Sequence, residues 1–146
     1  MNIKKTANLL LNFAIKRLAE IFGIIIFTTG IMLLIALTSY SPEDPNYIFP
    51  KNTEIKNLLG FQGSFVSDLF FQSLGLISYL VSFTLIITGI NIFKIKEFFL
   101  IIENIFFTTL YSIVGTLFLT YFYYQGFTLY INGNGGFVGN YLNQTF

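Results

Sequence analysis

The residue types that carry chemistry in most enzymes are scarce in this sequence of 146 residues. It contains no cysteine and no histidine, so thiol nucleophiles, disulfides and the commonest zinc, haem and iron–sulfur ligands are missing. Serine hydroxyls are present, but a serine nucleophile needs a neighbouring base, and histidine is the usual base at neutral pH. We therefore expect that this chain is not an enzyme and that it holds neither a metal nor a cofactor.

A glycine cluster near the C-terminus comes closest to a nucleotide-binding motif. Residues 133–136 are Gly-Asn-Gly-Gly, and Gly139 follows them. A phosphate-binding loop also requires Gly-Lys-Ser/Thr between a strand and a helix, and no lysine follows Lys96 in this chain. We interpret the cluster as a flexible turn outside the membrane.

Two acids lie close to apolar segments. An ionisable group inside a bilayer indicates a transport pathway or a proton relay. Asp68 follows Ser64 and Ser67 at the start of one apolar run, and Glu103 precedes another. Because carboxylates are favoured at helix N-termini, we expect each acid to cap a helix, with a pathway role as the alternative.

The composition predicts an integral membrane protein. Hydrophobic residues make up 54% of the chain and charged residues 10%, against about 45–50% and about 25% in a typical soluble domain. The formal charge of +1 is spread along the chain, so no basic face is available for nucleic acid. Apolar runs at 21–40, 69–93 and 105–122 each match a hydrocarbon core of about 30 Å. We predict an all-α membrane helical bundle with these three spanning helices.

Lysine and arginine set the predicted topology. Lys4, Lys5, Lys16 and Arg17 precede the first span, Lys94 and Lys96 separate the second from the third, and no basic residue follows. The positive-inside rule then places the N-terminus in the cytoplasm. We expect residues 1–20 to form a short helix along the inner headgroups, with Leu9, Leu10, Phe13 and Leu18 on one face. Residues 21–146 form the membrane domain, with an outer loop 41–64, an inner loop 94–104 and an outer glycine-rich tail 123–146.

Small residues mark where the spans are expected to touch, because membrane helices associate through close packing. The second span carries a stripe of Gly75, Ser78, Ser82 and Gly89, the third has Thr108, Ser112 and Gly115, and the first has Gly23 and Gly30. These seams either hold one protomer together or join several protomers, and both alternatives stay open.

The connection after the first span carries a turn motif. Pro42 and Pro45 push Ser41 and Asp44 out of the helical region, so the first helix is expected to stop sharply there.

This motif belongs to an ordered set of short patterns along the chain. They are Ser39–Pro45, Asn57-Leu-Leu-Gly60 with Gly63, Asp68, Leu74-Gly75 with Tyr79, and Gly135-Gly136-Phe137-Val138-Gly139. From Arg17 onward, their order and spacing resemble the N-terminal four-helix membrane domain of the FtsK/SpoIIIE DNA translocases. The residues that carry the resemblance as candidate structural sites are Ser41, Pro42, Asp44, Pro45, Asn57, Gly60, Gly63, Asp68, Gly75, Gly136 and Gly139.

The resemblance implies a multi-pass domain of the bacterial inner membrane, at the division septum, that anchors a hexameric ATP-driven DNA pump. Chromosome segregation and cell division would be its setting. The implied partners are the lipid bilayer, further copies of the chain and other membrane proteins of division, while DNA is reached only through a motor domain.

In that family a fourth helix, a linker and a P-loop ATPase follow the glycine-rich loop. This sequence ends at Phe146, about where the fourth helix would begin. It is then expected to be a truncated or split product, or to end in a stub of that helix at 137–146. The alternatives are a small channel, holin or transporter subunit, in which polar residues would converge inside the bundle, and an orphan membrane scaffold without a motor.

Overall fold

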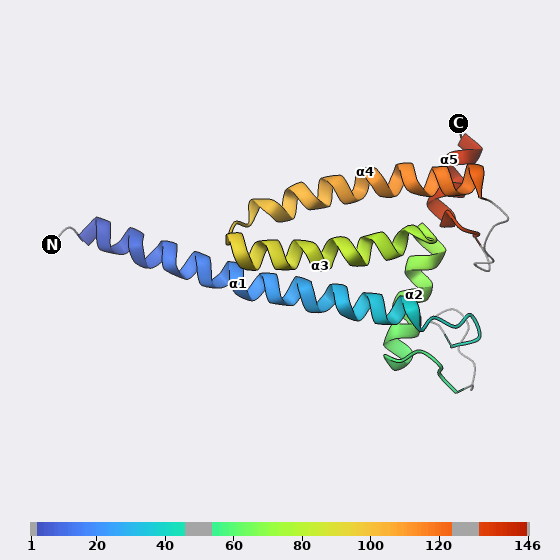
Figure 1. The fold of residues 1–146 in the computed structure, drawn as a ribbon, viewed down its shortest axis with the longest axis horizontal. Helices are drawn as coiled ribbons and strands as arrows, with labels where there is room; N and C mark the ends of the chain where they lie inside the picture. The colour runs from blue at the N-terminus through green and yellow to red at the C-terminus, as the bar shows by residue number, and fades with distance from the viewer. Residues whose placement is uncertain (1–2, 46–53, 124–131, 146) are drawn as a thin grey trace.

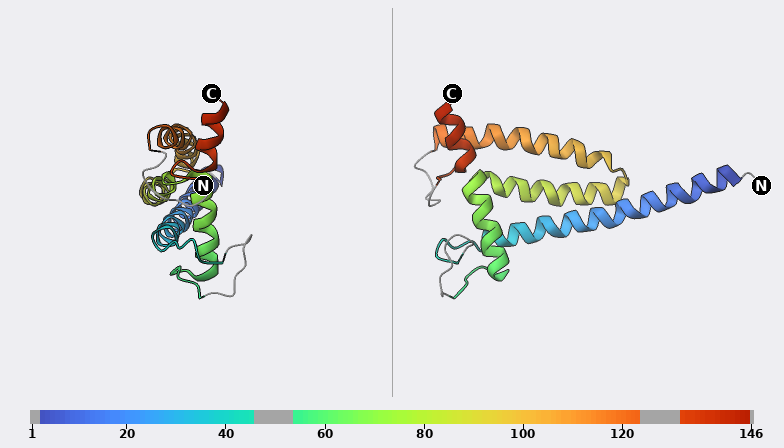
Figure 2. Two further views of the ribbon diagram at one scale, coloured as in Figure 1. Left: turned by 90° about the vertical axis from the view of Figure 1, so that its right-hand side faces the viewer. Right: turned by 180° about the vertical axis from the view of Figure 1, so that it is seen from behind.

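The computed structural model describes residues 3–45, 54–123 and 132–145, with side chains from residue 7 onward. These residues form five helices and no strand: α1 (Ile3–Thr38), α2 (Gly60–Leu74), α3 (Ile77–Ile95), α4 (Phe99–Phe122) and α5 (Gly136–Thr145). Helices α1, α3 and α4 lie side by side in one layer, with α3 in the middle (Figure 1). Helices α2 and α5 cross one side of that layer where α1 finishes (Figure 2). We call this end of the bundle the loop end, and the opposite end, at Lys94 and Lys96, the basic end.

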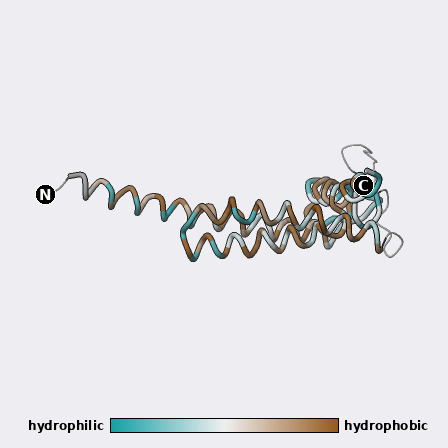
Figure 3. The backbone as a smooth tube through the Cα atoms, turned by 90° about the horizontal axis from the view of Figure 1, so that it is seen from above, coloured by the Kyte–Doolittle hydropathy of each residue, from teal (hydrophilic) through white to brown (hydrophobic). Residues whose placement is uncertain are grey.

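Three helices are long and apolar enough to cross a membrane: Ala7–Thr38 of α1, Ile77–Ile95 and Phe99–Phe122. At about 1.5 Å per residue, α3 extends about 28 Å and α4 about 36 Å, against a hydrocarbon core of about 30 Å. Apolar residues recur along these three helices (Figure 3). The predicted all-α bundle with three spanning helices is confirmed.

Side-chain burial is reversed relative to a soluble domain. Large apolar side chains point outward, as at Ile25, Ile87 and Ile105, which are 51%, 58% and 61% exposed. The interior instead contains many hydroxyl side chains: Ser64, Ser67, Ser78, Ser82, Thr88, Ser112, Thr116 and Thr120. A soluble domain hides its apolar side chains, whereas helices in lipid expose them and keep small residues at their contacts. The chain is a multi-pass membrane protein.

Glycines bring α1 and α3 into direct backbone contact. A Cβ atom at Gly89 would lie 2.5 Å from the amide nitrogen of Phe27, and one at Gly23 would lie 2.9 Å from the carbonyl oxygen of Gly89. A Cβ atom at Gly30 would lie 2.8 Å from the amide nitrogen of Ile86. Gly23 of the seam predicted on the first span and Gly89 of the seam predicted on the second span therefore meet inside one chain.

The rest of the stripe predicted on the second span does not act as one seam. Gly75 lies before α3 begins. Ser78 donates a hydrogen bond to the carbonyl of Phe70 at 2.9 Å, and Ser82 donates to the carbonyl of Tyr79 at 2.7 Å. On α4, Gly115 leaves room for the side chain of Ile77.

The predicted start of the second span, at residue 69, is wrong. Residues 69–74 belong to α2, and α3 begins at Ile77. The chain turns at Gly75, whose φ of 58° and ψ of −139° are readily adopted only by glycine. The amide of Leu76 then donates to the carbonyl of Asn134 at 2.9 Å, outside any helix. An uninterrupted apolar run therefore contains two helices.

Other predicted boundaries also move. The short helix expected at 1–20 is not a separate element, because α1 continues through residue 20. Helix α2 begins inside the predicted outer loop 41–64, and the predicted inner loop 94–104 shrinks to 96–98. The predicted tail 123–146 contains α5, whose ten residues extend only about 15 Å. Residues 46–53 and 124–131 of the predicted loop and tail lie outside the described residues.

Candidate functional site: two junctions at the loop end

The first junction, which we call the loop junction, is built around Asp44. Its side chain is 6% exposed. One carboxylate oxygen accepts the backbone N–H of Lys56 at 2.9 Å and the other accepts that of Asn57 at 2.8 Å. Asp44 is presented by a turn in which its own N–H donates to the carbonyl of Ser41, with Pro42 at the position that proline favours in such turns. The carboxylate therefore holds together the two ends of the connection between α1 and α2.

Asn57 continues the loop junction into α1. Its amide nitrogen Nδ2 donates to the carbonyl of Ala36 at 2.9 Å, and its Oδ1 accepts the backbone N–H of Leu59 at 3.0 Å. Ala36 lies in the last turn of α1, where carbonyls lack partners within the helix. The same side chain thus caps α1 and shapes the turn that leads into α2.

Gly60, Gly63 and Pro45 complete this junction. Gly60 begins α2 with a φ of 67°. Gly63 lies directly against Oδ1 of Asn57, so a Cβ there would overlap that oxygen. The carbonyl of Pro45 accepts a hydrogen bond from the hydroxyl of Ser64 at 3.0 Å.

Two tyrosines extend the junction to neighbouring helices. The hydroxyl of Tyr79, on α3, donates to the carbonyl of Leu37 at 3.2 Å, so a second terminal carbonyl of α1 is paired. The hydroxyl of Tyr40 donates to Oδ1 of Asp68 at 3.1 Å. Both tyrosine rings pack on Phe71, with centroids 4.9 Å and 5.6 Å away.

The capping roles predicted for the two acids are wrong. Asp68 lies within α2, well past Gly60, and its side chain faces Tyr40 because α2 begins earlier than predicted. Glu103 lies beyond the first turn of α4, which begins at Phe99, and it is exposed.

An exposed ion pair lies beside the loop junction. The Nζ of Lys56 lies 2.6 Å from the carboxylate of Glu43. The hydrogen bond to Glu43 raises the pKa of the Lys56 ammonium above its usual value. Because both side chains are largely exposed, we expect this pair to add little stability.

The second junction, which we call the glycine junction, joins the α2–α3 turn to α4 and α5. Gly75 lies directly against the carbonyl of Asn134, and Gly136 lies against Ser73, where a Cβ would be 2.6 Å from the carbonyl oxygen. Gly139 presses on α4, where a Cβ would be 2.5 Å from the carbonyl oxygen of Thr116. The glycine cluster therefore provides close packing and is not the free turn that the sequence predicts.

Asparagines supply the hydrogen bonds of the glycine junction. Asn134 is 1% exposed, and its Nδ2 donates at 2.5 Å to the carbonyl of Tyr123, the capping residue that follows the end of α4. Asn132 donates to the carbonyl of Gln72 at 3.2 Å, and Asn140 donates to the carbonyl of Asn132 at 2.7 Å. These bonds tie the segment before α5 to α2 and α4.

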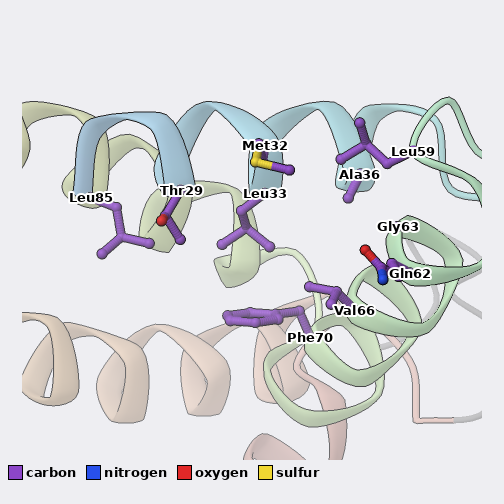
Figure 4. Close-up of a pocket in the computed structure, with 10 residues that line it drawn as sticks. All are labelled: Thr29, Met32, Leu33, Ala36, Leu59, Gln62, Gly63, Val66, Phe70 and Leu85. Carbon is purple, nitrogen blue, oxygen red and sulfur yellow. The ribbon is translucent and has the colours of Figure 1, made fainter. Parts of the chain in front are cut away.

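A groove lies beside the loop junction, where α2 crosses α1 (Figure 4). Its volume is about 340 Å³, and its walls are mainly apolar side chains. Met32, Leu33 and Ala36 come from α1, whereas Val66 and Phe70 come from α2. Thr29 and Gln62 are the polar residues among those that line it, so the groove offers no ionisable group for acid–base chemistry.

The two junctions bring together nearly all of the residues singled out from the sequence. Ser41, Pro42, Asp44, Pro45, Asn57, Gly60 and Gly63 meet in the loop junction, and Gly75, Gly136 and Gly139 meet in the glycine junction. Sequence reasoning missed the roles of Asn134 and Tyr79. Asn134 stood among glycines in a segment interpreted as a turn, where asparagine is common and draws no notice. Within the described residues, no three acidic side chains gather into a possible metal site.

Comparison with known proteins supplies the family. The model of the 4TM region of DNA translocase FtsK/SpoIIIE matches residues 15–146. DNA translocase FtsK of Azospirillum brasilense is 35% identical over 72 residues, which are 48% of this chain and 11% of that protein. DNA translocase FtsK of Caulobacter vibrioides is 31% identical over 73 residues, 50% of this chain and 9% of that protein.

The Rickettsia prowazekii DNA translocase FtsK is 29% identical over 72 residues, 49% of this chain and 10% of that protein. The matches thus span about a tenth of the length of these relatives. No solved structure matches the chain. Since the family model covers most of the sequence, including both junctions, the chain belongs to the family of the 4TM region of DNA translocase FtsK/SpoIIIE.

Proposed function

We propose that this chain is the membrane-anchoring and assembly module of an FtsK-like DNA translocase. It would act in the bacterial inner membrane at the division septum, in chromosome segregation and cell division. The observation that carries the proposal is the family match over residues 15–146, which covers most of the first candidate span and all of the other two. ATP hydrolysis and DNA transport would belong to a motor domain that works with this region.

The hydrogen bonds of the motif residues support an anchoring role over a catalytic one. Both carboxylate oxygens of Asp44 accept backbone N–H groups, and the side-chain oxygen and nitrogen of Asn57 bond the backbone at Leu59 and Ala36. Groups with such partners hold the chain in one conformation and are not free to bind a substrate. The motif residues are therefore suited to fixing the relative positions of the spans.

The channel alternative predicts polar side chains converging along a path through the membrane. Within the described residues, the hydroxyls of Ser82 and Thr116 instead donate to backbone carbonyls of their own helices, and the hydroxyl of Ser78 donates to the carbonyl of Phe70 on α2. Asp44, the one buried carboxylate among the residues that the structure describes, lies in the loop junction at the end of the bundle. These three hydrogen bonds therefore give the channel alternative no support.

A domain exchange tests the proposal. In Caulobacter vibrioides, this chain would replace the matching membrane region of DNA translocase FtsK, with a fluorescent tag on the hybrid. We expect septal enrichment and normal cell length. A hybrid carrying both Asp44→Ala and Asn57→Ala should lose septal enrichment, whereas one carrying Glu43→Ala, at an exposed side chain of the same connection, should keep it. Uniform membrane fluorescence of the unaltered hybrid, at normal abundance, would count against the proposal.

A further inference from the structure

Helix α1 continues past the basic end of the bundle. An ion pair marks where the packed part ends: Nζ of Lys96, just after α3, lies 2.5 Å from the carboxylate of Glu20 on α1. Ala19 beside it is fully buried. Residues 3–19 then project beyond α3 and α4 (Figure 1), and at about 1.5 Å per residue they extend about 25 Å. We call these residues the α1 extension.

The α1 extension exposes large apolar side chains. Leu9, Leu10, Leu11 and Phe13 are each 60–66% exposed, and Leu18 is 50% exposed. Large apolar side chains exposed in this number mark an interaction surface, because water is a poor environment for them. The extension therefore requires a partner that accepts apolar side chains.

The charge of the α1 extension selects that partner. Lys4, Lys5, Lys16 and Arg17 lie within residues 1–19, and that stretch contains no acid. Two such helices packed together would repel each other. Anionic lipid headgroups would instead attract the cations while the acyl region receives the leucines. Lys94 and Lys96 lie at the same end of the bundle, which is the end expected to face an anionic cytoplasmic leaflet.

We propose that the α1 extension binds the surface of an anionic phospholipid bilayer at the basic end of the bundle. Its apolar side chains enter the boundary between headgroups and acyl chains, and α1 bends beside Ala19, where it leaves the packed bundle. The region thus senses lipid charge as well as crossing the membrane.

The absence of cysteine from the sequence makes a direct test simple. The full chain carrying Leu10→Cys is labelled with an environment-sensitive fluorophore in nanodiscs of phosphatidylcholine, with or without phosphatidylglycerol. With phosphatidylglycerol, we expect emission at shorter wavelength and protection from iodide quenching. A second probe at Ile105→Cys, an exposed position on α4, should emit at short wavelength and resist iodide quenching in both lipids. That result would show that the bundle is inserted in the bilayer.

Removal of charge supplies the matched comparison. The variant Lys4→Gln/Lys5→Gln/Lys16→Gln keeps Arg17, which pairs with Glu20. Each cation near an anionic surface contributes about fivefold, so the ratio of bound to free extension should fall about a hundredfold. Lys94→Gln, a charge removed from α3 at the same end, should leave the Leu10 probe unchanged. Equal emission from the Leu10→Cys probe in the two lipids would overturn the proposal. Disulfide pairing of two Leu10→Cys chains in both lipids would also overturn it, because it would identify a second copy of the chain as the partner.

Discussion

Replacing Asp44 by alanine should destabilise the loop end of the bundle strongly. The carboxylate is 6% exposed and accepts two backbone N–H groups, from Lys56 and Asn57. Alanine would leave the buried N–H of Asn57 and the partly buried N–H of Lys56 without their partner. A buried donor that loses its partner costs about 1–3 kcal/mol, so we expect the free energy of unfolding to fall by about 2–5 kcal/mol.

The neighbouring acid provides a control of the same chemistry. The side chain of Glu43 is 75% exposed, and it pairs with the equally solvated ammonium of Lys56. Exposed ion pairs contribute little, so Glu43→Ala should leave stability almost unchanged. Asp44→Asn, which retains one carbonyl oxygen as an acceptor, should fall between the two alanine variants.

Two measurements separate the local effect from general weakening. Unfolding in mixed micelles, followed by helical circular dichroism as the fraction of denaturing detergent rises, gives the stability difference. Hydrogen exchange at the amides of Lys56 and Asn57 should speed up about a hundredfold in Asp44→Ala if local opening costs about 3 kcal/mol less. The reasoning is refuted if Asp44→Ala and Glu43→Ala unfold at the same detergent fraction, or if those two amides keep their protection.

Two glycine substitutions test the close contacts. Gly89→Ala would place a Cβ 2.5 Å from the amide nitrogen of Phe27, so we expect the free energy of unfolding to fall by about 1–3 kcal/mol in the same assay. Gly115→Ala should cost less, because its Cβ would meet only the movable side chain of Ile77. Equal losses in the two variants would contradict a backbone contact at Gly89. Gly75→Ala should cost more than Gly60→Ala: both have positive φ, which costs about 1–2 kcal/mol for a side chain, but only at Gly75 would the Cβ overlap another backbone, that of Asn134. Equal costs would show that φ alone matters.

The number and kind of the spans could be predicted from the sequence because membrane insertion depends on length and apolarity, which composition displays directly. The start of the second span could not be predicted. The apolar run continues without a charge from α2 through Gly75 into α3, and hydropathy does not register a backbone turn. The turn depends on the φ of Gly75 and on an acceptor, the Asn134 carbonyl, supplied by a segment far along the chain.

The two junctions could likewise be predicted only where they depend on local sequence. The turn around Pro42 and Pro45 is a local property, and its prediction as the stop of the first helix is confirmed by the end of α1 at Thr38. The partners of Asp44 and Asn57 are non-local, since Asn57 reaches back to Ala36 across the whole connection. Local helix rules predicted capping for Asp68, but the bond from Tyr40 requires α2 to cross the end of α1.

The distribution of polar contacts explains how such a bundle could serve as an anchor. At the loop end, side chains pair the last carbonyls of α1 and cap α4, and the backbone carbonyl of Asn134 accepts a hydrogen bond from Leu76 in the α2–α3 turn. At the basic end, the described contacts are of a different kind: Glu20 pairs with Lys96, and the rings of Phe22 and Phe98 meet edge to face at 5.7 Å. Ion pairs and ring contacts tolerate small displacements better than buried hydrogen bonds, whose loss leaves unpaired polar atoms. The loop end therefore carries the contacts that are costliest to break, and the basic end, where α1 leaves the packed bundle, is held by an ion pair, a ring contact and the close approach of Gly23 to Gly89 and Phe93.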